Sequence, residues 1–233
     1  MLNGLYFYND GGMWIIALIA AVWSMIASAR VSSTFKKYST LMNSRGFTGE
    51  TCARMLLQSA GVNDVRIERV SGNLTDHFDP KAKVIRLSDS VYSSNSVASI
   101  GVAAHEAGHA IQHAVGYFPI KIRQAIIPVC NIGSNLAMPL ILLGIFTSMT
   151  GLSYLGILLF SLSAFFQLVT LPVEFNASRR ALEYLRDGAT LSGDELKAAR
   201  RVLSAAAMTY VAALAVSLAN ILRLLAIVNN RRR

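Results

Sequence analysis

The feature that most constrains the fold is a long stretch of sequence without charge. Between Arg123 and Glu174 lie 50 consecutive positions without Asp, Glu, Lys, Arg or His. This length suffices for two bilayer crossings, since each takes about 20 residues. Two further uncharged stretches of spanning length, 11–29 and 202–222, lie near the ends of the chain. The sequence therefore predicts a membrane protein, and a composition of 53% hydrophobic and 15% charged residues agrees with this.

The basic residues indicate how these stretches are oriented. The net charge is +9, and 18 of the 22 Lys and Arg residues lie between Arg30 and Arg201, outside the hydrophobic stretches. Because cytoplasmic loops are enriched in Lys and Arg, we expect these segments in the cytoplasm and the N-terminus outside. No basic stripe interleaved with aromatic residues occurs, so no nucleic-acid partner is expected. Cys52 and Cys130 stand far apart in the chain, which favours two reduced packing residues over a disulfide framework.

A short motif carries the chemistry. Residues 102–116 read VAAHEAGHAIQHAVG and contain His105, Glu106 and His109 in the spacing HExxH. Residues four apart lie on one face of a helix, so both imidazoles can bind one metal ion. Glu106 is then placed to accept a proton from a water molecule that the metal activates. The alternative interpretation is a purely structural histidine pair. A helix is favoured by the Ser-Asn-Ser run at 94–96, which offers N-caps.

The motif needs a third ligand, because a catalytic zinc usually has three protein ligands and one open position. His113 is eight residues from His105, roughly 12 Å along a helix axis at about 1.5 Å per residue, and is too far away to share the ion. Glu174 is the better candidate. It begins the segment EFNASRRAL, where the predicted membrane hairpin returns the chain to the same side of the membrane as the motif. An alternative is that Glu174 is an N-terminal acid stabilised by its helix dipole. Glu183, nine residues on, is expected to be solvated.

These residues predict a site of the thermolysin kind with one zinc per chain. Glu106 would take a proton as water attacks a carbonyl and would pass it to the leaving amine, so the reaction class is amide hydrolysis. The developing oxyanion also needs a hydrogen-bond donor. His77, within the segment TDHFDP, is either such a donor or a turn residue. The other candidates for this role are His113, Tyr184, Arg179 and Tyr210.

The whole chain divides into five expected parts. Residues 1–30 are an N-terminal transmembrane anchor, and 31–131 are an α+β cytoplasmic part with the motif helix. Residues 132–172 are a transmembrane hairpin, 173–201 a third-ligand helix and connector, and 202–233 a C-terminal hydrophobic helix. That last helix either crosses the bilayer or packs in or along it, because crossing leaves the terminal arginines outside, against the charge rule. The expected fold class is a mainly α membrane protein with three to four transmembrane helices and an α+β insert.

Local patterns predict the elements of the insert. We expect an amphipathic helix over 31–42 and a helix over 48–60 that is capped by Thr48. Strands are expected near 65–70 and 84–87, flanked by turn residues. These strands are too few for a large sheet.

Local patterns also predict the elements that follow the motif helix, which should end near Pro119. The hairpin is expected to cross over 132–149 and to return as far as Pro172, which should separate it from a polar helix over 173–186. Ser192 and Glu195 then form a capping-box pattern for a helix that can run into the last hydrophobic stretch.

Five segments of the chain have an order and spacing that are more specific than HExxH alone. They are LTDHFDP (74–80), IRLSDSVY (85–92), HEAGHAIQHA (105–114), PVCNIGS (128–134) and LPVEFNASRRAL (171–182). Together they resemble the YugP-like family of bacterial membrane zinc metallopeptidases. The resemblance implies zinc ligands at His105, His109 and Glu174, with Glu106 as the catalytic acid and base.

The chain is also similar, more distantly, to HtpX-type membrane proteases. Their third-ligand helix typically carries an Asp four residues after the Glu, where this sequence has Ser178. A carboxylate that orients a zinc-bound histidine is therefore not evident at that position. Asp76, Asp79 and Asn176 are the other candidates for the orienting role. The expected insert is zincin-like, and the YugP-like resemblance implies the bacterial inner membrane. The charge distribution predicts that the active site faces the cytoplasm.

Two functional hypotheses follow. The first is a membrane-bound zinc endopeptidase that acts on protein or peptide substrates near the bilayer. The second is a non-hydrolytic membrane scaffold or chaperone-like protein with a structural zinc site. A transporter is disfavoured, because at most four spans and no inverted repeat are visible. The sequence defines neither the substrate nor the oligomeric state.

Overall fold

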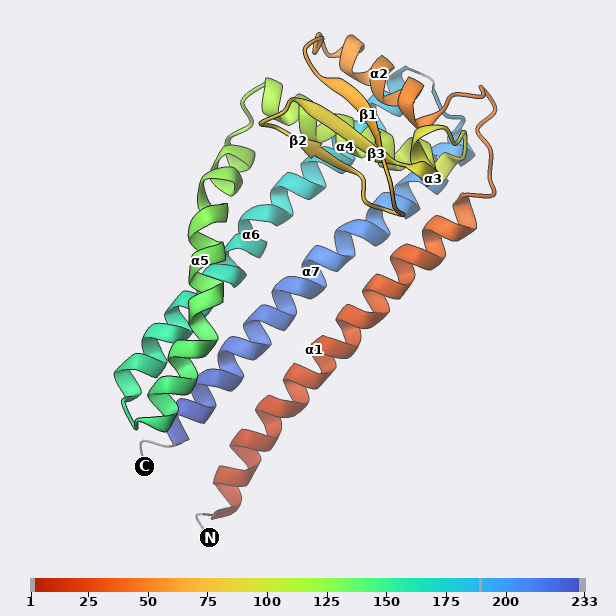
Figure 1. The fold of residues 1–233 in the computed structure, drawn as a ribbon. Coiled ribbons are helices and arrows are strands. Elements are labelled where there is room, and N and C mark those ends of the chain that lie inside the picture. The colour runs from red at the N-terminus through yellow and green to blue at the C-terminus, as the bar shows by residue number, and fades with distance from the viewer. Residues whose placement is uncertain (1–2, 189, 231–233) are drawn as a thin grey trace. The chain divides into compact units, whose positions relative to one another are not determined.

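The computed structural model describes residues 3–188 and 190–230 (Figure 1). Side chains are described from residue 12 onwards. Helices dominate this part of the chain, as predicted, and the strands form one small sheet. The helices are α1 (Asn3–Tyr38), α2 (Gly49–Ser59), α3 (Asp89–Tyr92), α4 (Val97–Ala114), α5 (Phe118–Phe146), α6 (Thr150–Asp187) and α7 (Gly193–Asn230). The strands are β1 (Arg66–Val70), β2 (His77–Asp79) and β3 (Val84–Ser88).

Four of the described helices are long and apolar enough to cross a membrane, namely α1, α5, α6 and α7. The apolar window of each has a mean hydropathy between 1.8 and 2.3, and α7 has the highest value. At most 28% of the residues in these windows are buried inside the protein, so most of their apolar side chains face outward. Outward apolar faces are suited to lipid, and the prediction of a mainly helical membrane protein is confirmed.

The chain forms two compact units. The first, the membrane unit, comprises Met1–Ala27, Ile122–Leu171 and Thr209–Arg233. The second, the polar unit, comprises Ser28–Lys121 and Pro172–Met208. Helices α1, α5, α6 and α7 each pass from one unit into the other.

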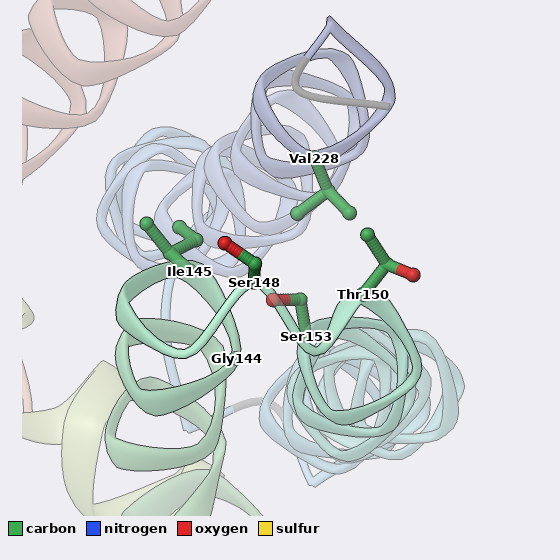
Figure 2. A pocket seen from close by; sticks show the side chains of 6 residues that line it. All are labelled: Gly144, Ile145, Ser148, Thr150, Ser153 and Val228. Carbon is green, nitrogen blue, oxygen red and sulfur yellow. The ribbon is translucent and has the colours of Figure 1, made fainter. Parts of the chain in front are cut away.

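Close helix packing organises the membrane unit. A Cβ atom at Gly156 of α6 would lie 2.7 Å from the carbonyl oxygen of Ala137 on α5, so only glycine permits this approach. Ile141, Ile157 and Leu224 form a small apolar core between α5, α6 and α7. A cavity of about 250 Å³ lies at the turn between α5 and α6 and contains none of the predicted site residues. Figure 2 shows its lining, which is made by Gly144, Ile145, Ser148, Thr150, Ser153 and Val228.

Two predicted helix breaks are wrong. Helix α1 continues unbroken through Tyr38 instead of giving way to a separate helix over 31–42, because no glycine or proline occurs between Gly12 and Gly46. Helix α6 runs through Pro172, so the polar helix expected over 173–186 is the end of α6. A proline has no backbone N–H, so it removes one backbone hydrogen bond of the helix, and long apolar helices accommodate that loss. Similarly, α5 already begins at Phe118, and Pro128 and Pro139 lie inside it.

The polar unit contains a three-stranded sheet in the order β1-β3-β2. Strand β1 is parallel to β3, and β2 is antiparallel to it, with Ile67 and Phe78 both beside Ile85. The central strand β3 is almost wholly buried. The strands expected near 65–70 and 84–87 are confirmed, whereas β2 was not predicted, because three residues carry no readable alternation.

Helices α2 and α4 share one hydrophobic core with the sheet. Helix α2 begins at a capping box formed by Thr48 and Thr51, which confirms Thr48 as its cap. Helix α4 is capped by Ser96, whose side chain accepts a hydrogen bond from the Ser99 backbone N–H at 3.2 Å. It ends at Ala114, five residues before Pro119, and Gly116 follows at a positive φ of 65°. The largest fully buried core side chains here are Ile85, Leu87, Ile100, Ile111 and Leu185.

Helix α7 begins as the sequence predicted and runs unbroken to Asn230. The Glu195 carboxylate accepts hydrogen bonds from the backbone N–H groups of Ser192 at 2.6 Å and Ser44 at 2.7 Å. One buried side chain therefore caps α7 and fixes the loop between α1 and α2. Arg201 of α7 donates to the Tyr38 hydroxyl at 2.9 Å, which ties the ends of α7 and α1 together within the polar unit.

Gly108 of α4 faces α6 so closely that its substitution should destabilise the polar unit. A Cβ atom there would lie 2.7 Å from the Ala177 carbonyl oxygen, which is backbone and cannot swing away. We expect Gly108→Ala to cost about 1–3 kcal/mol through overpacking. Gly101→Ala is the matched control, because its Cβ would meet Ala199 at an ordinary 3.6 Å. It should be neutral or gain up to about 1 kcal/mol of helix propensity. Thermal unfolding in detergent measures both changes, and equal melting temperatures would contradict this packing.

Candidate active site

Helix α4 places His105 and His109 one turn apart, with their rings 4.6 Å apart between centroids. The Nε2 atoms of both rings point to one oxygen of Glu174. The distances to Glu174 Oε2 are 3.2 Å from His105 Nε2 and 3.6 Å from His109 Nε2. The three ligand atoms lie within 4.8 Å of one another. Two imidazoles and a carboxylate therefore converge on one point.

Helix α6 brings Glu174 to this point because α4 and α6 approach at Gly108 and Ala177. Glu174 is 2% exposed, in the interior of a helix that begins at Thr150. The alternative that Glu174 is an acid at a helix N-terminus is therefore wrong. A buried carboxylate is costly unless it is paired, and here His105 Nε2 lies within hydrogen-bond distance of it.

The donor set fits a zinc ion. Zinc in catalytic sites is commonly held by two histidines and one glutamate, with a further position open to water. The three residues would supply His105 Nε2, His109 Nε2 and a Glu174 carboxylate oxygen. All three are mostly buried, and the His105 side chain, at 15% exposure, is the most accessible of them. The cluster thus has the chemistry of a metal centre with one accessible side.

Glu106 lies beside this cluster rather than in it. It is 8% exposed, and burial raises its pKa to about 7. The neighbouring carboxylates of Glu174 and Asp76 raise this pKa further, while His105 lowers it. A carboxyl group with such a pKa exchanges protons readily near neutral pH.

Each histidine is oriented through its other ring nitrogen. His105 Nδ1 lies 3.1 Å from the hydroxyl of Ser178, the residue that stands where HtpX-type proteins carry Asp. His109 Nδ1 lies 3.0 Å from Gln112 Oε1. Sequence analysis missed Gln112 as a partner of His109, although a spacing of three residues on one helix face was an available signal. Asn176 is hydrogen-bonded to Gln112 Nε2 at 2.9 Å.

The two aspartates that the sequence offered as orienting groups have other partners. Asp76 accepts hydrogen bonds from the Ser88 backbone N–H at 2.7 Å and from the Ser88 hydroxyl. Asp79 accepts from the Lys81 backbone N–H at 2.9 Å and pairs with Arg86 at 3.2 Å. These contacts indicate that both aspartates shape the segment around β2.

The structure places the candidate oxyanion donors at varied positions. His77 is exposed on β2, with Nδ1 2.8 Å from the Thr75 carbonyl oxygen, and its charge affects the pKa of Glu106. His113 packs edge-on against Phe78, with centroids 5.8 Å apart. Arg179 is exposed and pairs with Glu183 at 4.0 Å, and Glu183 is not part of the ligand cluster. Tyr184 packs against the core of the polar unit, and Tyr210 belongs to the membrane unit.

The cluster predicts a strict dependence of metal binding on Glu174. We expect about one zinc per chain in the purified wild type and a large loss in Glu174→Ala, because only two protein ligands remain. Glu183→Ala is the matched control on the same helix, because its exposed carboxylate pairs with Arg179. Elemental mass spectrometry of the detergent-purified proteins measures both. If Glu174→Ala retained its zinc, the third ligand would lie elsewhere.

Comparisons with known proteins identify the family. No solved structure matches the chain. The chain is 46% identical over 221 residues to "Putative membrane protease YugP" of Bacillus subtilis (strain 168). The aligned region covers 94% of this chain and 98% of that protein. A family model described as "Putative neutral zinc metallopeptidase" matches residues 13–229. The resemblance seen in the sequence is therefore confirmed, and the chain belongs to this family of membrane zinc metallopeptidases.

Proposed function

We propose that the protein is a membrane-bound zinc endopeptidase, which hydrolyses peptide bonds in proteins or peptides near the membrane. The observation that carries this proposal is the convergence of His105, His109 and Glu174 within 4.8 Å, with Glu106 buried beside them. The family and the similarity to a membrane protease support the same reaction class. One zinc ion per chain matches the single cluster of this kind among the described residues.

Zinc, when bound, supplies a Lewis acid that polarises a carbonyl group and activates water near neutral pH. The two imidazole Nε2 atoms and the Glu174 carboxylate would hold it. Ser178 and Gln112 orient the imidazoles through their Nδ1 atoms. The ligands are thus fixed by hydrogen bonds behind them, as effective metal sites require.

Glu106 moves the proton in this mechanism. Its carboxylate accepts a proton from the attacking water and then donates it to the nitrogen of the leaving amine, which balances the hydrolysis. The burial of Glu106 beside His105 keeps bulk water from competing for that proton.

The polar unit is proposed to be a zincin-like insert. Its small mixed sheet, the motif helix α4 and the third-ligand helix α6 are the elements that such an insert needs. The five-part division of the chain at residues 30, 131, 172 and 201 belongs to the same proposal. Its support is that the ligands come from α4 and α6, on either side of the predicted hairpin.

The proposed location is the bacterial inner membrane, with several spans and the active site facing the cytoplasm. The support is the distribution of charge, because 18 of the 22 Lys and Arg residues lie between Arg30 and Arg201. Four helices of spanning length agree with a multi-pass arrangement. The bilayer and membrane-proximal polypeptides are the proposed partners, and nucleic acid is not.

Glu106→Gln separates the enzyme from a non-hydrolytic scaffold with a structural zinc. The amide cannot accept the proton, so cleavage of labelled casein in detergent should fall by about 10²- to 10⁴-fold. Zinc content and melting temperature should stay at the wild-type level, because Glu106 is not in the ligand cluster. Wild-type protein that holds zinc but cleaves no faster than Glu106→Gln would favour the scaffold.

The orientation of the chain is tested with single cysteines and a membrane-impermeant maleimide. Lys81→Cys on the polar unit should react only from the cytoplasmic side, and Thr147→Cys at the hairpin turn only from the outside. Both positions are exposed, whereas the natural Cys52 and Cys130 are buried and give a low background. Reaction of Lys81→Cys in intact cells would reverse the proposed orientation.

A further inference from the structure

A chain of hydrogen bonds leads from the surface of α6 to the second histidine of the motif. Arg180 Nε donates to Asn176 Oδ1 at 2.9 Å. Gln112 Nε2 lies 2.9 Å from the same Asn176 oxygen and 2.8 Å from the carbonyl oxygen of Val173. Gln112 Oε1 lies 3.0 Å from His109 Nδ1. The side chains of Gln112 and Asn176 are buried, so water does not replace these partners.

The direction of each hydrogen bond follows from two groups with fixed roles, the Arg180 guanidinium and the Val173 carbonyl. An arginine guanidinium only donates, so Asn176 presents its oxygen to Arg180. A backbone carbonyl only accepts, so Gln112 presents its NH₂ group to Val173. The Asn176 oxygen is a second acceptor for that NH₂ group. Gln112 is therefore held, from two independent contacts, with its carbonyl oxygen toward His109.

This orientation selects one tautomer of His109. Because Gln112 Oε1 can only accept, the neutral imidazole carries its proton on Nδ1. The Nε2 atom then has a free lone pair, and it is the atom that points to Glu174 Oε2. A neutral imidazole with a free lone pair on Nε2 is the form that binds a metal ion.

His105 is held differently. Its Nδ1 faces the hydroxyl of Ser178, which can either donate or accept. Ser178 therefore orients the ring of His105 without selecting its tautomer. The two ligands of the motif are thus unequal, and only His109 is preset by its surroundings.

We infer that Gln112, anchored by Val173 and by Arg180 through Asn176, is a positioning residue that presets His109 as a metal ligand before the metal arrives. Arg180 acts at a distance, by fixing which way the Asn176 amide faces. The inference rests on the proposed metal site. It assigns a role to Gln112, Asn176 and Arg180, none of which binds the metal directly. It also predicts that substitutions further from His109 weaken zinc binding less.

The first readout is the tautomer of His109 in zinc-free protein. Nitrogen NMR of histidine-labelled protein in detergent distinguishes a protonated ring nitrogen from a bare one, and the chain has only 4 histidines to assign. We expect His109 to carry its proton on Nδ1 in the wild type. Gln112→Leu should lose this preference. A residue that merely filled space would not change the tautomer when substituted.

The second readout is zinc affinity, measured by competition with a chelator. Gln112→Leu should weaken zinc binding by about 10- to 100-fold, as removal of such supporting partners typically does. Arg180→Met should weaken it less, because the Val173 carbonyl still holds Gln112. Gln112→Glu should weaken it as well, because a carboxylate cannot donate to the Val173 carbonyl or to Asn176. The matched controls, Gln58→Leu and Arg186→Met, change exposed side chains on α2 and α6 and should have no effect.

The outcomes separate this inference from the proposed function. A wild type that binds no zinc contradicts the metal site, whereas its NMR spectrum still decides the tautomer. A proton on Nε2 of His109 in the zinc-free wild type would overturn the inference, as would wild-type zinc affinity in Gln112→Leu. If Gln112→Leu does not fold, the wild-type spectrum and the ranking of Arg180→Met against Arg186→Met decide.

Discussion

The close packing of α4 on α6 is the contact on which the rest of the site depends. It is possible because Gly108 has no side chain where the Ala177 carbonyl oxygen approaches. At this separation the Glu174 side chain reaches the imidazoles of His105 and His109 on α4. A larger separation would leave the Glu174 carboxylate buried without its His105 partner, which is costly. Backbone proximity between two helices thus sets the chemistry.

The same contact surface explains why the interior of the polar unit tolerates so many polar groups. Behind the ligands, Ser178 and Gln112 satisfy the Nδ1 atoms of the two histidines. Gln112 in turn uses both hydrogens of its amide, on Val173 and Asn176. Buried polar networks stabilise a single arrangement only when every member has a partner. This network has partners at each step, so it holds the ligand set in one geometry.

The sequence predicted features that local patterns determine. Hydrophobic length identified the membrane helices, and a spacing of four identified the pair of His105 and His109. Glu174 was found because it is the first charged residue after a long uncharged stretch. Its contact with His105 spans 69 positions, yet a hairpin returns the chain to the same side and makes that contact readable. The cap at Thr48 followed from local chemistry in the same way.

The features that sequence analysis missed depend on contacts between distant segments. The turn chemistry around Pro172 suggests a helix end, but an apolar helix keeps its remaining backbone bonds and α6 continues. Strand β2 exists because β3 offers it an edge, not because His77 to Asp79 alternate in polarity. The sequence shows Gln112 only as a polar residue on the motif helix. Its orientation depends on the Val173 carbonyl of α6, which accepts a hydrogen bond from its amide. In each case the partner, rather than the residue type, decides the role.

X-ray absorption at the zinc edge, on the purified wild type, tests the central claim most directly, because it reports the atoms around the metal. The account predicts scattering from two imidazole rings and from oxygen, all at about 2.0–2.2 Å, and none from sulfur. Sulfur scattering at about 2.3 Å would implicate Cys52 or Cys130 and would contradict a site built from His105, His109 and Glu174. A shell with one imidazole would contradict it equally.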